Sequence, residues 1–102
     1  MEPTETGRDS IRASFEKLRL ELRRDTSYSW PRRAEALMSM SNLCTDQECW
    51  DAFKAAANLR DLLDQINDDK TSKRKRDEDL HVLISLVKET EASVARYLEV
   101  EA

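Results

Sequence analysis

Glycine and proline are almost missing from this chain, which has one glycine, Gly7, and two prolines, Pro3 and Pro31. Folds built on β-strands need these residues in their turns, so all-β and α/β architectures are excluded. No apolar run approaches the roughly 18 residues that a membrane span requires. None follows the polar start MEPTETGRDS either. We therefore expect neither a membrane segment nor a signal peptide.

Cysteine and histidine are equally scarce. Cys44 and Cys49 are too few for a disulfide framework and lack the paired spacing of zinc sites, and His81 is the only histidine. We expect two reduced cysteines near a helix junction, no metal site and no cofactor. An intracellular, cytoplasmic protein is the expected setting.

Charged and apolar residues make up most of what is present. The 102 residues are 39% hydrophobic and 37% charged, which is typical of one small globular domain. A domain of this size has a limited core, and association with a second chain would add stability. The net charge of −4 argues against a general polyanion binder.

Hydrophobic spacing predicts helices through most of the chain. Ile11, Phe15 and Leu18 recur at helical spacing after the N-cap candidate Ser10. Pro31 suits the first turn of a second helix. The segment Thr45–Glu48 fits a capping box, with the Thr45 hydroxyl accepting from the Glu48 amide.

The expected fold is therefore all-α, a small antiparallel bundle of four helices at 10–24, 31–44, 46–66 and 76–100. A flexible N-terminal tail is expected at 1–8, and a single domain at 9–102 with a charged loop at 67–76. The start of the last helix is expected between Ser72 and Glu78. Because cations are disfavoured at the positive end of a helix, either this helix begins after Arg76 or the four basic charges meet another group.

Each predicted helix has apolar residues away from its main stripe. At about 100° per residue, Leu20 falls opposite Ile11, and Ala36 and Leu43 lie off the main face of the second helix. In the later helices, the residues that lie off the main apolar stripe are Trp50, Phe53, Val82, Leu86, Tyr97 and Val100. A helix that is apolar on more than one side is either central in its own bundle or covered by another chain.

The aromatic residues allow two interpretations. Trp50 and Phe53 either close the core or face a partner. Tyr28 and Trp30, in a connection beside Arg32 and Arg33, have the composition of a binding hot spot, although Trp30 could also cover the end of the bundle. The candidate partner-binding residues are Tyr28, Trp30, Trp50, Phe53, Val82, Leu86 and Tyr97.

One short motif resembles a known family. The spacing Arg76-Asp77-x-x-x-His81 is similar to the R-[N/D]-x-x-x-H signature of the HEPN family of small helical bundles, which often act as metal-independent ribonucleases after two protomers pair. The resemblance covers six residues. It implies that Arg76 stabilises phosphate charge, that His81 acts as acid or base, and that Asp77 orients the pair.

The basic patch of Lys73, Arg74, Lys75 and Arg76 has three further interpretations. It could be a nuclear import signal if the organism is eukaryotic. It could contact a nucleic acid or an acidic partner locally. Alternatively, it pairs within the chain with the acidic run at 77–79.

These observations together predict a protein that is not an enzyme. We expect a protein–protein interaction module, such as an adaptor, an inhibitor or a small subunit, that self-associates or docks onto a protein partner through its apolar helix faces. The alternative is the HEPN-like ribonuclease that uses Arg76 and His81.

Overall fold

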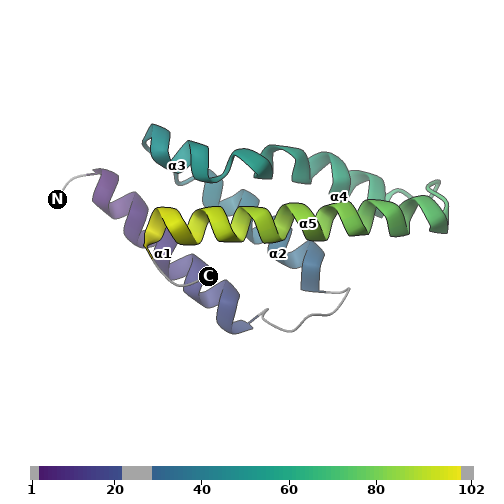
Figure 1. Ribbon diagram of the computed structural model, residues 1–102, viewed down its shortest axis with the longest axis horizontal. Coiled ribbons are helices and arrows are strands. Elements are labelled where there is room, and N and C mark those ends of the chain that lie inside the picture. The colour runs from purple at the N-terminus through teal and green to yellow at the C-terminus, as the bar shows by residue number, and fades with distance from the viewer. Residues whose placement is uncertain (1–2, 22–28, 100–102) are drawn as a thin grey trace.

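The computed structural model of the protein describes residues 3–21 and 29–99, and the side chains of 3–7 and 21 are not described. The described residues form five α-helices, one 3₁₀ helix and no β-strand, which confirms the all-α prediction. In chain order the elements are α1 (Pro3–Glu21), α2 (Ser29–Ser41), α3 (Gln47–Ala52), η1 (Lys54–Asn58), α4 (Leu59–Asn67) and α5 (Lys73–Leu98) (Figure 1).

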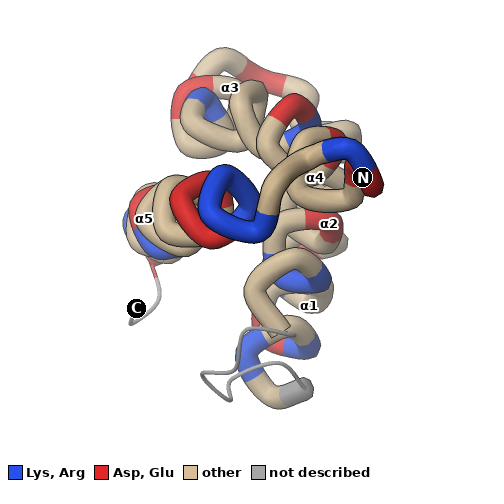
Figure 2. The backbone as a smooth tube through the Cα atoms, turned by 90° about the vertical axis from the view of Figure 1, so that its right-hand side faces the viewer, with Lys and Arg blue, Asp and Glu red and all other residues tan. Residues whose placement is uncertain are grey.

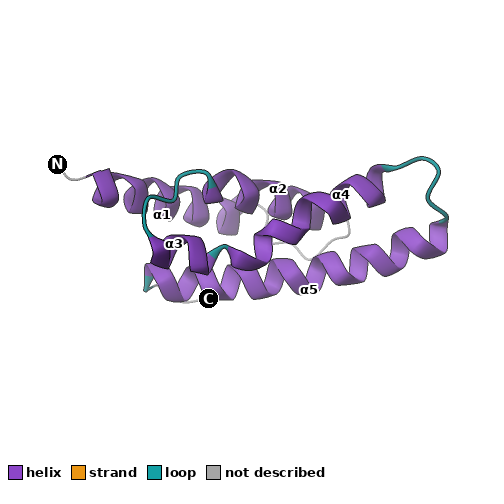
Figure 3. Ribbon diagram, turned by 90° about the horizontal axis from the view of Figure 1, so that it is seen from above, coloured by secondary structure: helices purple, strands orange, loops and turns teal. Residues whose placement is uncertain are grey.

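The longest helix, α5, is the axis of the bundle. Its 26 residues run most of the length of the molecule, and α3, η1 and α4 lie alongside it in the opposite direction (Figure 3). On another side α5 packs against α2, and α1 packs chiefly against α2. The result is an elongated bundle with extents of 50 × 24 × 17 Å.

The core follows one stripe of α5. Its members are buried at spacings of four, four, three, four and four residues, as a helix requires for one continuous face. They are Asp79, Leu83, Val87, Thr90, Val94 and Leu98. Thr90 satisfies its buried hydroxyl by donating to the Leu86 carbonyl oxygen at 2.7 Å. A polar residue therefore occupies the stripe without leaving an unpaired donor.

Both of the first two helices begin earlier than expected. Helix α1 begins at Pro3 rather than Ser10, so helix occupies part of the expected tail at 1–8. Proline is compatible with this because a first-turn amide has no intrahelical partner. Helix α2 begins at Ser29 and ends at Ser41, rather than running over 31–44. Residues 22–24, the expected end of the first helix, lie outside the described residues.

The predicted helix at 46–66 is divided into three pieces, so the expectation of one continuous helix is wrong. A 3₁₀ segment, η1, separates α3 from α4. In a 3₁₀ helix side chains three residues apart are eclipsed. Phe53, Ala56 and Leu59 have this spacing, and all three are buried. The tighter winding thus places three core residues in line.

The last helix begins at Lys73, inside the interval of 72–78 expected for its start but before residue 76, so helix replaces the second part of the charged loop expected at 67–76. Ser72 is the N-cap, and its hydroxyl accepts a hydrogen bond from the Lys75 amide at 3.2 Å. The connection after α4 is correspondingly short. The helix ends before Glu99, which has the left-handed conformation typical of a helix end, with φ of 59°.

Candidate functional site

Helix α3 is short, and two local interactions fix the chain where α3 begins: an N-cap hydrogen bond and a disulfide. Asp46 is its N-cap, and the carboxylate accepts a hydrogen bond from the Cys49 amide at 2.7 Å. The N-cap is therefore Asp46 rather than the predicted Thr45, and Cys49 at the third helical position supplies no carboxylate to complete a capping box. A disulfide joins Cys44 to Cys49 with the Cα atoms 5.4 Å apart, so the expectation of two reduced cysteines is also wrong.

Trp50 and Phe53 differ in exposure, so they do not share one of the two interpretations given for them above. Phe53 is buried in the core, together with Cys49 and Ala52 of the same segment. Trp50 keeps 52% of its surface exposed on the outer side of α3. The disulfide and the Asp46 cap restrain the backbone next to Trp50. The exposed indole is therefore attached to a rigid segment of the chain.

Trp30 lies in the core, which corrects its placement in an exposed connection. It belongs to the first turn of α2 and is only 4% exposed. The Arg33 guanidinium stacks over its ring at 4.1 Å from the centroid, and the Lys88 ammonium lies 5.6 Å from the centroid. The alternative, in which Trp30 covers the end of the bundle, stays a prediction. Tyr28 lies outside the described residues.

The partner of Arg33 is a carboxylate on the central helix. Arg33 Nε donates to Glu91 Oε2 at 2.9 Å, and Nη2 donates to Glu91 Oε1. Each side chain is only 14% exposed. This bidentate pair and the ring of Trp30 form a cluster that joins α2 to α5.

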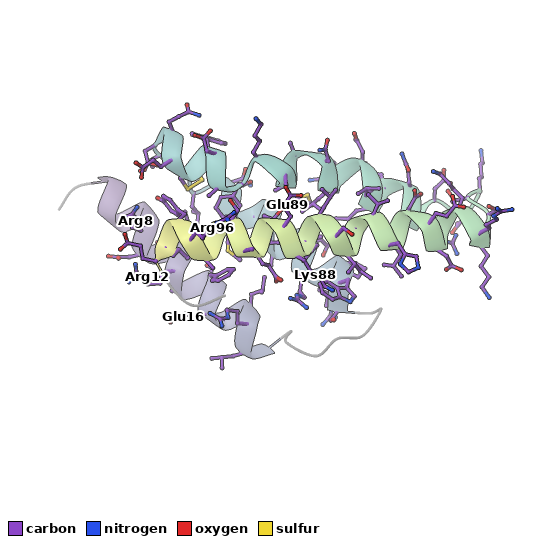
Figure 4. All side chains as sticks on the ribbon, viewed as in Figure 1. Arg8, Arg12, Glu16, Lys88, Glu89 and Arg96 are labelled. Atoms are coloured by element: carbon purple, nitrogen blue, oxygen red, sulfur yellow. A yellow bond between two sulfur atoms is a disulfide. The ribbon has the colours of Figure 1, made fainter. Side chains whose placement is uncertain are left out.

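The remaining candidates on α5 differ in exposure. Val82 is 49% exposed, whereas Leu86 and Tyr97 are half-buried against the core. The Arg8 guanidinium lies over the Tyr97 ring at 4.6 Å from the centroid, beside the C-terminal end of α5 (Figure 4). A hydrogen bond with Tyr97 raises the pKa of Arg8 above its ordinary value. Val100 lies outside the described residues.

The basic patch occupies the first turn of α5 at one end of the molecule, followed by an acidic turn (Figure 2). Arg74 Nε lies 3.6 Å from Glu78 Oε1, and Lys75 Nζ lies 3.2 Å from Asp79 Oδ1. Two members of the patch thus pair within the chain, as one of the interpretations expects. Lys73 forms no ion pair with any residue that the structure describes.

Among the described residues no hydrogen bond or ion pair links Arg76, Asp77 and His81 to one another. The Arg76 guanidinium donates through Nη2 to the Asp68 carbonyl oxygen at 3.2 Å. Asp77 and His81 are both exposed. Positions five residues apart on a helix differ by about 140° around its axis. The ribonuclease arrangement that the HEPN resemblance implies stays a prediction.

A groove that sequence reasoning did not identify lies between α1 and α2. Ala36, Ser39 and Met40 line it from α2, Leu43 lines it from the turn after α2, and Ser14, Lys17 and Leu18 line it from α1. Its volume is about 290 Å³. A signal was present in the sequence, because Ala36 and Leu43 lie off the main face of the second helix. Counting positions on single helices does not show that α1 completes the groove.

No protein-family model, curated protein or solved structure matches the chain. Within residues 3–21 and 29–99 no group of three or more histidine, cysteine, aspartate or glutamate side chains is arranged to hold a metal ion. Over the same residues no helix has the length and apolar character that crossing a membrane requires.

Proposed function

We propose that the protein is a non-enzymatic protein–protein interaction module that docks onto a protein partner or a second copy of itself. The observation that carries the proposal is the exposed side chain of Trp50 on α3. Tryptophan is among the residues most enriched in the central, energetically dominant part of protein interfaces. Covering its exposed half would contribute about 2 kcal/mol to association.

Three further large apolar side chains support the proposal. Leu20 is 74% exposed, Leu43 is 40% exposed and Val82 is 49% exposed. The core is already closed by residues from every helix. These side chains are therefore surplus to the fold, as expected of a protein that offers apolar surface to another chain.

The test replaces Trp50 with glutamate. We expect Trp50→Glu to weaken capture of the partner, or self-association measured by sedimentation equilibrium, by at least about tenfold, since a buried charge replaces an apolar anchor. Gln47→Glu is the matched control, because it adds the same charge to an exposed position of the same short helix. It should bind as the wild type does.

A second variant separates this function from the ribonuclease alternative. His81→Ala should leave partner binding unchanged, because His81 lies on the exposed surface of α5, away from α3. Loss of an RNA cleavage activity in His81→Ala would contradict the non-enzymatic proposal. The proposal would also be contradicted if the protein stays monomeric and Trp50→Glu has no effect on the capture of any partner.

A further inference from the structure

The residues that line the groove between α1 and α2 have the spacing of a helix contact. On α2 the lining positions are i, i+3 and i+4, and on α1 they are likewise i, i+3 and i+4, in the set given above, while Leu43 is added by the turn that follows α2. Positions at this spacing form one face of a helix. Each helix therefore turns a face into the groove that is distinct from the centre of its core stripe.

The groove has an apolar floor with small residues along it. Leu18 and Met40 are buried and form the floor, while Leu43 remains 40% exposed at one side. Ser14, Ala36 and Ser39 are small, which lets a helix backbone approach closely. A volume of about 290 Å³ is at the lower limit for cofactor pockets but accommodates a few side chains of a docked helix.

Charge narrows the choice of occupant. Lys17 is the one charged residue among those that line the groove. It is exposed and forms no ion pair with any residue described in the structure. A carboxylate on the docked helix would complement this ammonium group, whereas a second cation would be repelled.

We propose that the groove binds an amphipathic helix of a partner protein, with apolar side chains at helical spacing and a carboxylate that meets Lys17. In this binding mode, the apolar face of the partner helix lies in the groove between α1 and α2. This inference deepens the proposed function and rests on it, but it concerns a surface other than Trp50.

The probes are two synthetic helical peptides of about 18 residues, with the same leucine face and either glutamate or lysine beside that face. The protein carries ¹³C-labelled methionine methyl groups. We expect the glutamate peptide to shift the Met40 methyl resonance, while Met38, which packs on another side of α2, stays unchanged. The glutamate peptide should bind about threefold tighter than the lysine peptide, the size of an exposed ion pair.

Two variants of exposed residues test the site without disturbing the core. Lys17→Glu should reverse the preference between the peptides, whereas Lys54→Glu, with the same change of charge on exposed η1, should not. Ser39→Trp should place a bulky side chain in the groove and reduce binding of the glutamate peptide at least about tenfold.

Three results would overturn the groove proposal: no shift at Met40 with either peptide, unchanged binding by Ser39→Trp, or a dimer in sedimentation that Ser39→Trp dissolves. The last would make a second copy the occupant. Trp50→Glu should bind the glutamate peptide as the wild type does. If the peptides fail while partner capture still depends on Trp50, the groove proposal is wrong and the proposed function stands.

Discussion

Arg33 and Glu91 form the most enclosed ion pair among the described residues. The pair is bidentate, and each side chain is 14% exposed. Breaking such a pair by removing one partner is costly because the remaining charge stays enclosed without compensation. The stacked ring of Trp30 loses its cation at the same time.

Arg33→Ala is therefore expected to lower the free energy of unfolding by about 2 kcal/mol, measured by urea denaturation. Arg60→Ala, which removes an exposed arginine from α4, should change it by less than about 0.5 kcal/mol. Replacing both Arg33 and Glu91 with apolar residues should recover most of the loss. If Arg33→Ala is as mild as Arg60→Ala, the cluster does not hold α2 to α5.

Some contacts of the site join residues that are far apart in the sequence, and for this reason they could not be predicted. Arg33 and Glu91 are 58 residues apart, and no local pattern pairs them. Trp30 lies beneath the Arg33 guanidinium of that pair and packs in the core, and neither contact can be seen in a local sequence pattern. The disulfide escaped for a related reason, because spacing alone does not show how the Cβ atoms of Cys44 and Cys49 are directed. Exposed Leu20, in contrast, follows from counting positions on a helix.

At the scale of elements, the start of α3 distinguishes two neighbouring capping residues. The Asp46 carboxylate accepts from the Cys49 amide at 2.7 Å, whereas Thr45 is exposed. Asp46→Ala should lower the free energy of unfolding by about 1 kcal/mol, the usual cost of losing an N-cap. Thr45→Ala should cost less than about 0.5 kcal/mol in the same urea titration. The reverse order would restore the capping box read from the sequence.

Apolar periodicity predicted where helices occur, because every helix buries one face, but it predicted their ends less well. The break at η1 has no glycine or proline to mark it, and it is set by the packing of Phe53, Ala56 and Leu59. The basic patch suggested a late start for α5. A cation at the positive end of a helix costs only about 0.3–1 kcal/mol. The Ser72 cap and two ion pairs at i and i+4 offset that cost.

At the scale of the whole molecule, the helices are not equally embedded. Helix α5 packs against α2, α3, η1 and α4, whereas α1 packs chiefly against α2. Near the last turn of α5, Arg8 of α1 lies over the Tyr97 ring and Arg12 Nη2 donates to the Leu98 carbonyl oxygen at 2.9 Å (Figure 4). Segments with fewer neighbours open at lower free energy than the centre of a fold.

Native-state hydrogen exchange should therefore show α1 opening before α5. Amides between Ile11 and Leu18 should exchange at lower denaturant than amides between Leu83 and Val94, although both segments are buried on one face. Arg12→Ala should speed exchange in α1 by about fivefold, as expected for loss of one charged hydrogen bond, and leave α5 unchanged. Lys17→Ala, on the same helix without an ion pair to the described residues, should change neither. Equal exchange rates in the two segments would mean that the bundle opens as one unit, and the groove between α1 and α2 would then persist until global unfolding.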